Sequence, residues 1–244
     1  MNALDLLVPD WPAPPGVFAV STLRTGGVSR GEFASLNLGD HVGDSPADVQ
    51  ENRRRLREAC DLPQEPNWLR QVHGVRVVDL DQPAPDMTAD AAFTRRSDVV
   101  CAVLTADCLP VLFADAAGTT VAAAHAGWRG LLAGVLEATV AAMRAAPADL
   151  IAWLGPAIGP QCFEVGPEVR EAFIGRDPDC AAAFVPHGAR HLADLPALAR
   201  RRLAAAGVRR VHDAAQCTHS QPQRFFSHRR DGRSGRQATL IWKR

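Results

Sequence analysis

The centre of the chain carries three apolar runs that each stop abruptly at polar residues. They cover residues 98–105, 110–114 and 119–124. Short and nearly continuous apolar runs are typical of strands that are buried on both faces, because a strand with one face in water alternates apolar and polar residues. The sequence therefore predicts a central sheet that is covered on both sides.

Segments with helical signals alternate with further apolar runs. Ser45 and Pro46 suit the N-cap and the first position of a helix that ends near Cys60. Two more helices are expected over residues 128–144 and 195–206. Additional strands are predicted at residues 17–21, 150–154, 208–211 and 237–242. This alternation indicates an α/β fold, built as a single three-layer domain with a mixed sheet.

The 244 residues are enough for one large domain, and no low-complexity linker divides them. The proline-rich opening, residues 1–16, is expected to be a loose N-terminal arm, and residues 17–244 are expected to form a single catalytic domain. Residues 24–43 are rich in Gly, Ser and Asn and are expected to form a long loop. Residues 68–78 are expected to be extended and to carry His73.

The composition argues against several kinds of catalysis. The only lysine is Lys243 and there is no tyrosine, so Schiff-base, pyridoxal-phosphate and P-loop lysines are not expected and tyrosine nucleophiles are excluded. Lys+Arg and Asp+Glu both number 27, and this balance gives no sign of a nucleic-acid or membrane partner. No protein partner is evident either.

The N-terminal residues lack the basic start and the unbroken apolar core of a signal peptide. A cytoplasmic location is therefore expected. The six cysteines are then expected to be reduced rather than paired. No Cys-x-x-Cys occurs, so neither a zinc ribbon nor a thioredoxin-like site is expected.

Three residues of metal-binding type lie at the ends of predicted elements, beside small residues. They are His73, Cys108 and His125. Each alone also suits an ordinary surface histidine or a buried thiol. Together they form a three-ligand zinc set, which leaves a fourth position open for water or substrate, as catalytic zinc sites do. We therefore expect these three residues to bind zinc and to be catalytic, whereas Cys101 is expected to be a buried structural thiol.

Two further polar motifs are candidates for substrate binding. Arg24 precedes Gly26 and Gly27, and a guanidinium beside flexible backbone amides can hold an anion such as phosphate. His228 lies in a polar cluster after an apolar pair at residues 225–226, and it is a candidate for contact with substrate. A plain turn is the more common outcome for the first motif, and an exposed turn with paired Arg and Asp explains the second equally well.

Taken together, these motifs resemble the YfiH/YlmD family over most of the chain. Members of that family have been labelled polyphenol oxidases or laccase-domain proteins, and also purine nucleoside phosphorylases, and one bacterial relative has been described as a peptidoglycan editing factor. The matching stretches are residues 22–29, 35–39, 41–44, 71–74, 89–91, 104–111, 124–130, 154–160, 162–166 and 226–231.

The resemblance implies a YfiH-like (CNF-like) three-layer α/β domain with a zinc ion held by His73, Cys108 and His125. It also implies phosphorolysis of adenosine, inosine, guanosine and methylthioadenosine, and deamination of adenosine, so that purine nucleosides and phosphate are the expected partners. Most relatives carry a Cys-Cys pair where this chain has Gln161-Cys162. That departure affects only a role for the first cysteine.

Two other functions remain open at this point. Copper-dependent polyphenol oxidation normally needs several His-x-His pairs, and the eight histidines of this chain form none. Copper is nevertheless a possible occupant, because it binds nitrogen and sulfur ligands more tightly than zinc does. Alternatively, Cys108 and His125 could be a thiol–imidazole pair in a cysteine-type hydrolase that acts on peptidoglycan precursors. His73 separates the two kinds of site, because only a metal centre needs all three residues.

Overall fold

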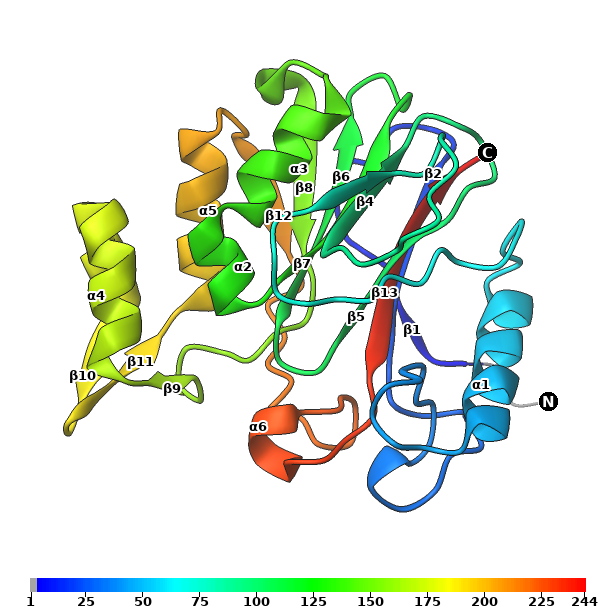
Figure 1. Cartoon of the computed structure of the whole chain (residues 1–244), viewed down its shortest axis with the longest axis horizontal. Helices are drawn as coiled ribbons and strands as arrows, with labels where there is room; N and C mark the ends of the chain where they lie inside the picture. Colours follow the sequence, from blue (N-terminus) through cyan, green and yellow to red (C-terminus); the bar gives the residue numbers. More distant parts are fainter. Residues whose placement is uncertain (1–3) are drawn as a thin grey trace.

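The computed structural model describes residues 4–244, which form two stacked sheets flanked by helices (Figure 1). The larger sheet has six strands in the order β12-β8-β6-β7-β4-β3. Its two edge pairs are parallel and its inner pairs are antiparallel, so the sheet is mixed, as expected. Its strands are β3 (Val77–Asp79), β4 (Ala91–Thr94), β6 (Leu109–Asp115), β7 (Val121–Ala126), β8 (Leu150–Leu154) and β12 (Arg210–Asp213).

The second sheet has four strands in the order β1-β2-β13-β5. Strand β13, red in Figure 1, pairs with strands from the start and the middle of the chain. A small third sheet, β10-β11-β9, lies with helix α4 at the opposite end of the molecule from α1. The bounds are β1 (Leu6–Leu7), β2 (Val17–Thr22), β5 (Cys101–Thr105), β13 (Gln237–Lys243), β9 (Glu164–Val165), β10 (Phe184–His187), β11 (Arg190–Ala193) and α4 (Pro167–Arg176).

The alternation of side chains along each strand sets the layers. On β6, Val111 and Phe113 pack in the core shared with α2 (Trp128–Ala133), α3 (Val135–Met143) and α5 (Leu195–Ala205). Leu112 points to the other side, where it packs in the core between the two large sheets together with Val103 of β5. The helices and the two sheets thus make the three expected layers.

Helix α1 (Pro46–Ala59) packs on the outer face of the four-stranded sheet, where Leu56 meets apolar side chains of β5 and β13. Its start confirms the sequence prediction: the Ser45 hydroxyl accepts the backbone N–H of Asp48 at 3.4 Å, and Pro46 is the first helical residue. The remaining short helices are η1 (Gly31–Phe33), η2 (Pro147–Asp149), η3 (Pro178–Ala183) and α6 (His228–Asp231).

Three local predictions were wrong, each for a specific reason. The helix expected over 128–144 is two helices, because Gly134 adopts a left-handed φ of 109° between α2 and α3. The segment 68–78 is not extended throughout, since His73 has a φ of 61° and lies in a turn before β3. The N-terminal arm is not loose along its whole length, because β1 pairs with β2; residues 1–3 of that arm lie outside the described residues.

None of the helices within residues 4–244 is both long enough and apolar enough to cross a lipid bilayer.

Candidate metal centre

Cys108 lies in the three-residue turn that joins β5 to β6. The turn is sharp because Asp107 has a φ of 85°, a conformation that aspartate tolerates better than most residues. Its carboxylate is fixed by the Thr218 hydroxyl at 2.7 Å and by the backbone N–H of Arg229 at 2.6 Å. These contacts tie the turn to the segment before β13 and set the direction of the Cys108 side chain.

His73 reaches the same place from a loop that is clamped to β5. The side-chain amide of Gln71 donates to the carbonyl of Leu104 at 2.8 Å and accepts the N–H of Leu104 at 2.7 Å. Gln71 thereby replaces a backbone partner at the end of β5. This pairing brings the loop that carries His73 to the strand end from which Cys108 follows.

Asp90, immediately before β4, connects this loop to the third candidate ligand. Its fully buried carboxylate accepts the backbone N–H groups of Val72, His73 and Gly74 at 3.1, 2.8 and 2.6 Å. It also bonds Nδ1 of His125 on β7 at 2.8 Å, which leaves Nε2 of that ring for a metal. Burial alone raises the pKa of Asp90, but the bonds from His125 and Gly74 outweigh it and lower the pKa overall.

The three candidate ligands converge. Their ligand atoms all lie within 4.8 Å of one another, and Cys108 Sγ is 3.6 Å from His73 Nε2. Zinc–nitrogen bonds of about 2.0–2.1 Å and zinc–sulfur bonds of about 2.3 Å put the two atoms of a tetrahedral site about 3.5 Å apart. The donor set and its spacing therefore fit a metal ion. Within residues 4–244 this is the one group of three or more His, Cys, Asp or Glu side chains that meets in this way.

The charges around Cys108 favour the form that binds metals. Burial raises the pKa of its thiol, but the His125 and His73 imidazoles outweigh burial and lower the pKa to about 6. Conversely, burial lowers the pKa of His125, but Cys108 and Asp90 outweigh it and raise the pKa to about 9. The two shifts favour a thiolate–imidazolium pair, so a metal cation that bound to both residues would release the proton of His125.

A cavity of about 200 Å³ opens beside the candidate ligands. Two cations at its wall, Arg129 and Arg229, were given no role by sequence reasoning, although they lie within the matching stretches 124–130 and 226–231. Arg129 stacks over Trp128 at 4.4 Å, and Arg229 stacks over Phe163 at 5.4 Å. The wall consists of His73, Ala106, Asp107, Cys108, Trp128, Arg129, Ile158, Phe163, Leu195, His228 and Arg229.

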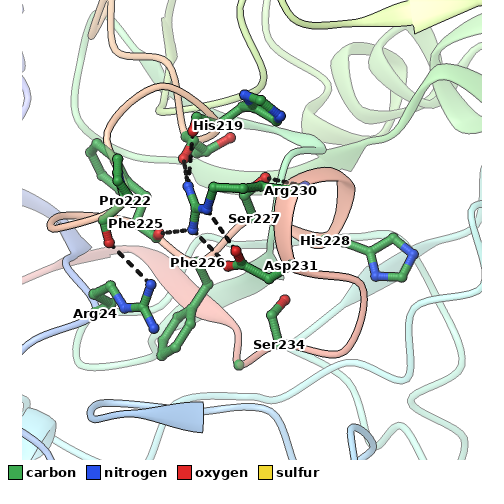
Figure 2. A network of polar contacts seen from close by, with 12 residues as sticks. Arg24, His219, Pro222, Phe225, Phe226, Ser227, His228, Arg230, Asp231 and Ser234 are labelled. Atoms are coloured by element: carbon green, nitrogen blue, oxygen red, sulfur yellow. Dashed lines mark hydrogen bonds and ion pairs between the residues drawn. The ribbon is translucent and has the colours of Figure 1, made fainter. Parts of the chain in front are cut away.

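Of the two residues predicted to bind substrate, only one lies at the cavity. His228 lines the cavity, whereas Arg24 does not. Arg24 donates to the carbonyl of Ala34 through Nε and one terminal nitrogen, at 3.0 and 2.9 Å, and to the carbonyl of Pro222 at 3.0 Å. In Figure 2 the guanidinium of Arg24 lies at one side of the segment 219–234 and bonds Pro222. The ring of His228 points away from the hydrogen bonds drawn there. The guanidinium of Arg24 is thus already engaged by the backbone.

Comparison with known proteins identifies the family of the chain. Residues 18–244 match the protein family described as multi-copper polyphenol oxidoreductase laccase. The chain belongs to this family. It is 55% identical to the purine nucleoside phosphorylase YfiH of Escherichia coli K12 over 238 residues, 97% of this chain and 98% of that protein. It is 54% identical to the purine nucleoside phosphorylase PA4543 of Pseudomonas aeruginosa, with 99% of each chain covered.

Crystal structures of family members have the same fold. The Neisseria meningitidis protein NMB0706 matches with a TM-score of 0.92 at 48% identity, covering 98% of each chain. YlmD from Geobacillus stearothermophilus matches with a TM-score of 0.91 at 34% identity, covering 100% of this chain and 98% of its own. The resemblance to the YfiH/YlmD family and the mixed α/β fold are therefore confirmed.

Gly127 provides a test of the candidate centre that leaves all three ligands in place. A Cβ on this residue would lie 2.6 Å from Cδ2 of His73 and 2.9 Å from Sγ of Cys108. Gly127→Ala is expected to displace these ligands and to weaken metal binding roughly 10- to 100-fold, the usual cost of misplacing ligands. Chelator competition measures the affinity.

The matched control is Gly175→Ala, where nothing lies within 4 Å of the added Cβ. This control is expected to bind metal like the unaltered protein. Equal affinities for the two variants would contradict the placement of the centre beside Gly127.

Proposed function

We propose that the protein is a zinc-dependent purine nucleoside phosphorylase that uses inorganic phosphate to cleave adenosine, inosine, guanosine and methylthioadenosine. The observation that carries the proposal is a three-ligand His-Cys-His centre that opens onto a cavity with two arginines at its wall. Relatives at 46–55% identity named purine nucleoside phosphorylase support the same activity.

Zinc is the metal that we assign to the centre. Two imidazoles and one thiolate suit zinc, and three protein ligands leave an open position. Multicopper oxidation needs several copper ions, whereas one such ligand group is present within residues 4–244. Copper remains able to occupy an N/S site, so a copper-loaded preparation is expected to show at most weak phenol oxidation.

The cavity residues divide the work of phosphorolysis. Arg129 and Arg229 are assigned to phosphate, because guanidinium groups bind it through paired hydrogen bonds. The side chain of Arg129 is exposed and stacks on Trp128, and within residues 4–244 its guanidinium makes no hydrogen bond or ion pair with another protein group. Arg229 keeps one nitrogen on the carbonyl of Glu164 at 2.6 Å, which fixes its direction. When bound, zinc would supply positive charge that stabilises the purine as it leaves.

Two other residues have assigned roles at the cavity, one in binding the ribose and one in positioning its neighbours. Nδ1 of His228 bonds the carbonyl of Gly232, so its Nε2 is an acceptor, and we assign that acceptor to a ribose hydroxyl. Both carboxylate oxygens of Asp107 already accept hydrogen bonds, from Thr218 and from the backbone of Arg229. Asp107 is therefore assigned to positioning Arg229 and Cys108 and not to moving a proton.

A second candidate function also has an observation in its favour. Cys108, His125 and Asp90 are arranged as a nucleophile, a base and a carboxylate that orients the base, which is the pattern of a cysteine hydrolase. A hydrolase of peptidoglycan precursors would use this triad. It would not need His73, whose Nε2 lies 3.6 Å from the same sulfur.

Substitution of the candidate ligands tests both functions. Cys108→Ala and His73→Ala are each expected to abolish phosphate-dependent release of the base from inosine, because each removes one of three metal ligands. Cys101→Ala is the matched control: this thiol is fully buried between the sheets, so its loss is expected to cost about 1 kcal/mol of stability and to spare activity.

Full activity in His73→Ala would contradict the metal-dependent mechanism and favour the cysteine triad. Full activity in Cys108→Ala would contradict both. Adenosine incubated without phosphate isolates deamination, the second activity expected from the resemblance, because that reaction consumes water.

The phosphate assignment has its own test. Arg129→Ala removes charge-assisted hydrogen bonds worth roughly 1.5–3 kcal/mol. It is therefore expected to raise the KM for phosphate about ten- to a hundredfold, with a much smaller change in the KM for inosine. Initial rates over a grid of both substrates measure the two constants.

Arg209→Ala, at an exposed arginine that follows α5 and does not line the catalytic cavity, is the control and is expected to change neither constant. Equal increases in both constants for Arg129→Ala would place Arg129 at the nucleoside and would contradict the assignment.

A further inference from the structure

Two cysteines outside the metal centre lie on neighbouring segments. Cys162 lies in the segment that follows β8, and Cys217 lies in the segment that follows β12. The two segments run side by side, because Ala157 and Cys217 form a parallel bridge and Thr218 donates its N–H to the carbonyl of Ala157 at 2.9 Å. The chain thus brings together two thiols that are 55 positions apart in the sequence.

The backbone of Gly159 makes hydrogen bonds to both cysteines. Its N–H donates to Sγ of Cys217 at 3.2 Å, and its carbonyl accepts the N–H of Cys162 at 3.0 Å. A side chain at this position would crowd the thiol, because a Cβ would lie 3.1 Å from Cβ and Sγ of Cys217. The N–H of Ser220 also donates to Sγ of Cys217 at 3.4 Å. Two N–H groups aimed at one sulfur stabilise the thiolate.

The two thiols have opposite electrostatic surroundings. Burial raises the pKa of Cys217, but the hydrogen bonds from Ser220 and Gly159 outweigh it and lower the pKa overall. The pKa of Cys162 is raised, first by burial and then by the negative charge of Cys217. Both side chains are partly exposed, and Cys217 lines a cavity of about 290 Å³. A small molecule in that cavity therefore meets a thiol with a lowered pKa and a second thiol near it.

We propose that Cys217 and Cys162 form a redox site that reacts with hydroperoxides and closes to a disulfide. In the first step the Cys217 thiolate attacks the O–O bond: an S–O bond forms, the O–O bond breaks, and hydroxide or alkoxide leaves and takes a proton from water. In the second step Cys162 attacks the sulfenic sulfur: the S–S bond forms, the S–O bond breaks, and water leaves. The two thiols lose two electrons and the hydroperoxide gains them.

The linkage bears on the neighbouring catalytic cavity. Ile158 lines both cavities, and Phe163, the residue after Cys162, lines the catalytic one. Thr218, the residue after Cys217, holds the carboxylate of Asp107. Closing the disulfide pulls on both segments, so nucleoside turnover is expected to fall; this consequence rests on the proposed phosphorolysis.

The test treats the reduced full-length protein with an equimolar amount of hydrogen peroxide, alkylates the free thiols and maps the peptides by mass spectrometry. We expect a peptide pair joined through Cys162 and Cys217 that dithiothreitol separates. In Cys162→Ser, Cys217 is expected to stop at a sulfenic acid that dimedone traps. In Cys217→Ser, Cys162 is expected to remain a free thiol.

Absence of the linked pair, or oxidation of Cys162 in Cys217→Ser at the unaltered rate, would overturn the proposal. The linked protein is expected to lose roughly tenfold or more in turnover, since small misplacements of catalytic groups are costly. Dithiothreitol is expected to restore it, and Cys162→Ser is expected to resist the loss. If the reduced protein shows no phosphorolysis, the proposed function fails while the peptide map still decides the redox site.

Discussion

The carboxylate of Asp90 holds both sides of the candidate metal centre in place. It is fully buried, and it accepts three consecutive backbone N–H groups from the loop of His73 and one ring nitrogen from His125. A buried charge is costly unless hydrogen bonds satisfy it, and these four bonds do so. A hydrogen bond that a histidine ring donates to a carboxylate also orients the ring and raises its basicity as a ligand. One residue therefore decides where two of the three ligands point.

The two turns that carry the candidate ligands His73 and Cys108 each contain a strained backbone conformation. His73 and Asp107 both have positive φ, at 61° and 85°, which costs of order 1–3 kcal/mol at each residue. Asp90 holds the first turn through the N–H groups of the loop, and Thr218 with Arg229 holds the second through the carboxylate of Asp107. The sheets supply the rest, because β5 and β6 fix the ends of the turn that carries Cys108. Rigid strands and a few buried hydrogen bonds thus preorganise the ligands.

Local sequence signals predicted the frame of the molecule well. The apolar runs became β5, β6 and β7, and the cap at Ser45 began α1, because burial and capping depend on nearby residues. The convergence of His73, Cys108 and His125 was also predicted, although His73 lies in a turn before β3 and not in the extended segment that was expected. The break at Gly134 was missed because a glycine within a helical pattern does not reveal its φ.

Roles that depend on distant partners were harder to predict. Asp90 lies in the matching stretch 89–91 but had no predicted role, because its partners come from residues 72–74 and 125. Arg24 beside two glycines suggested an anion site, but carbonyls from residues 34 and 222 take its guanidinium. Arg129 and Arg229 were not assigned a role from the sequence, and the fold brings them to one cavity. Side-chain pairing across the chain is a tertiary property that spacing in the sequence does not encode.

We propose a single mononuclear zinc centre, and metal analysis of the purified protein tests this proposal most directly. Inductively coupled plasma mass spectrometry with quantitative amino-acid analysis measures the metal content per chain. The account predicts about one zinc ion per chain, lost when any of the three ligands is replaced. Several copper ions per chain, or a fully active protein that contains no metal, would contradict it.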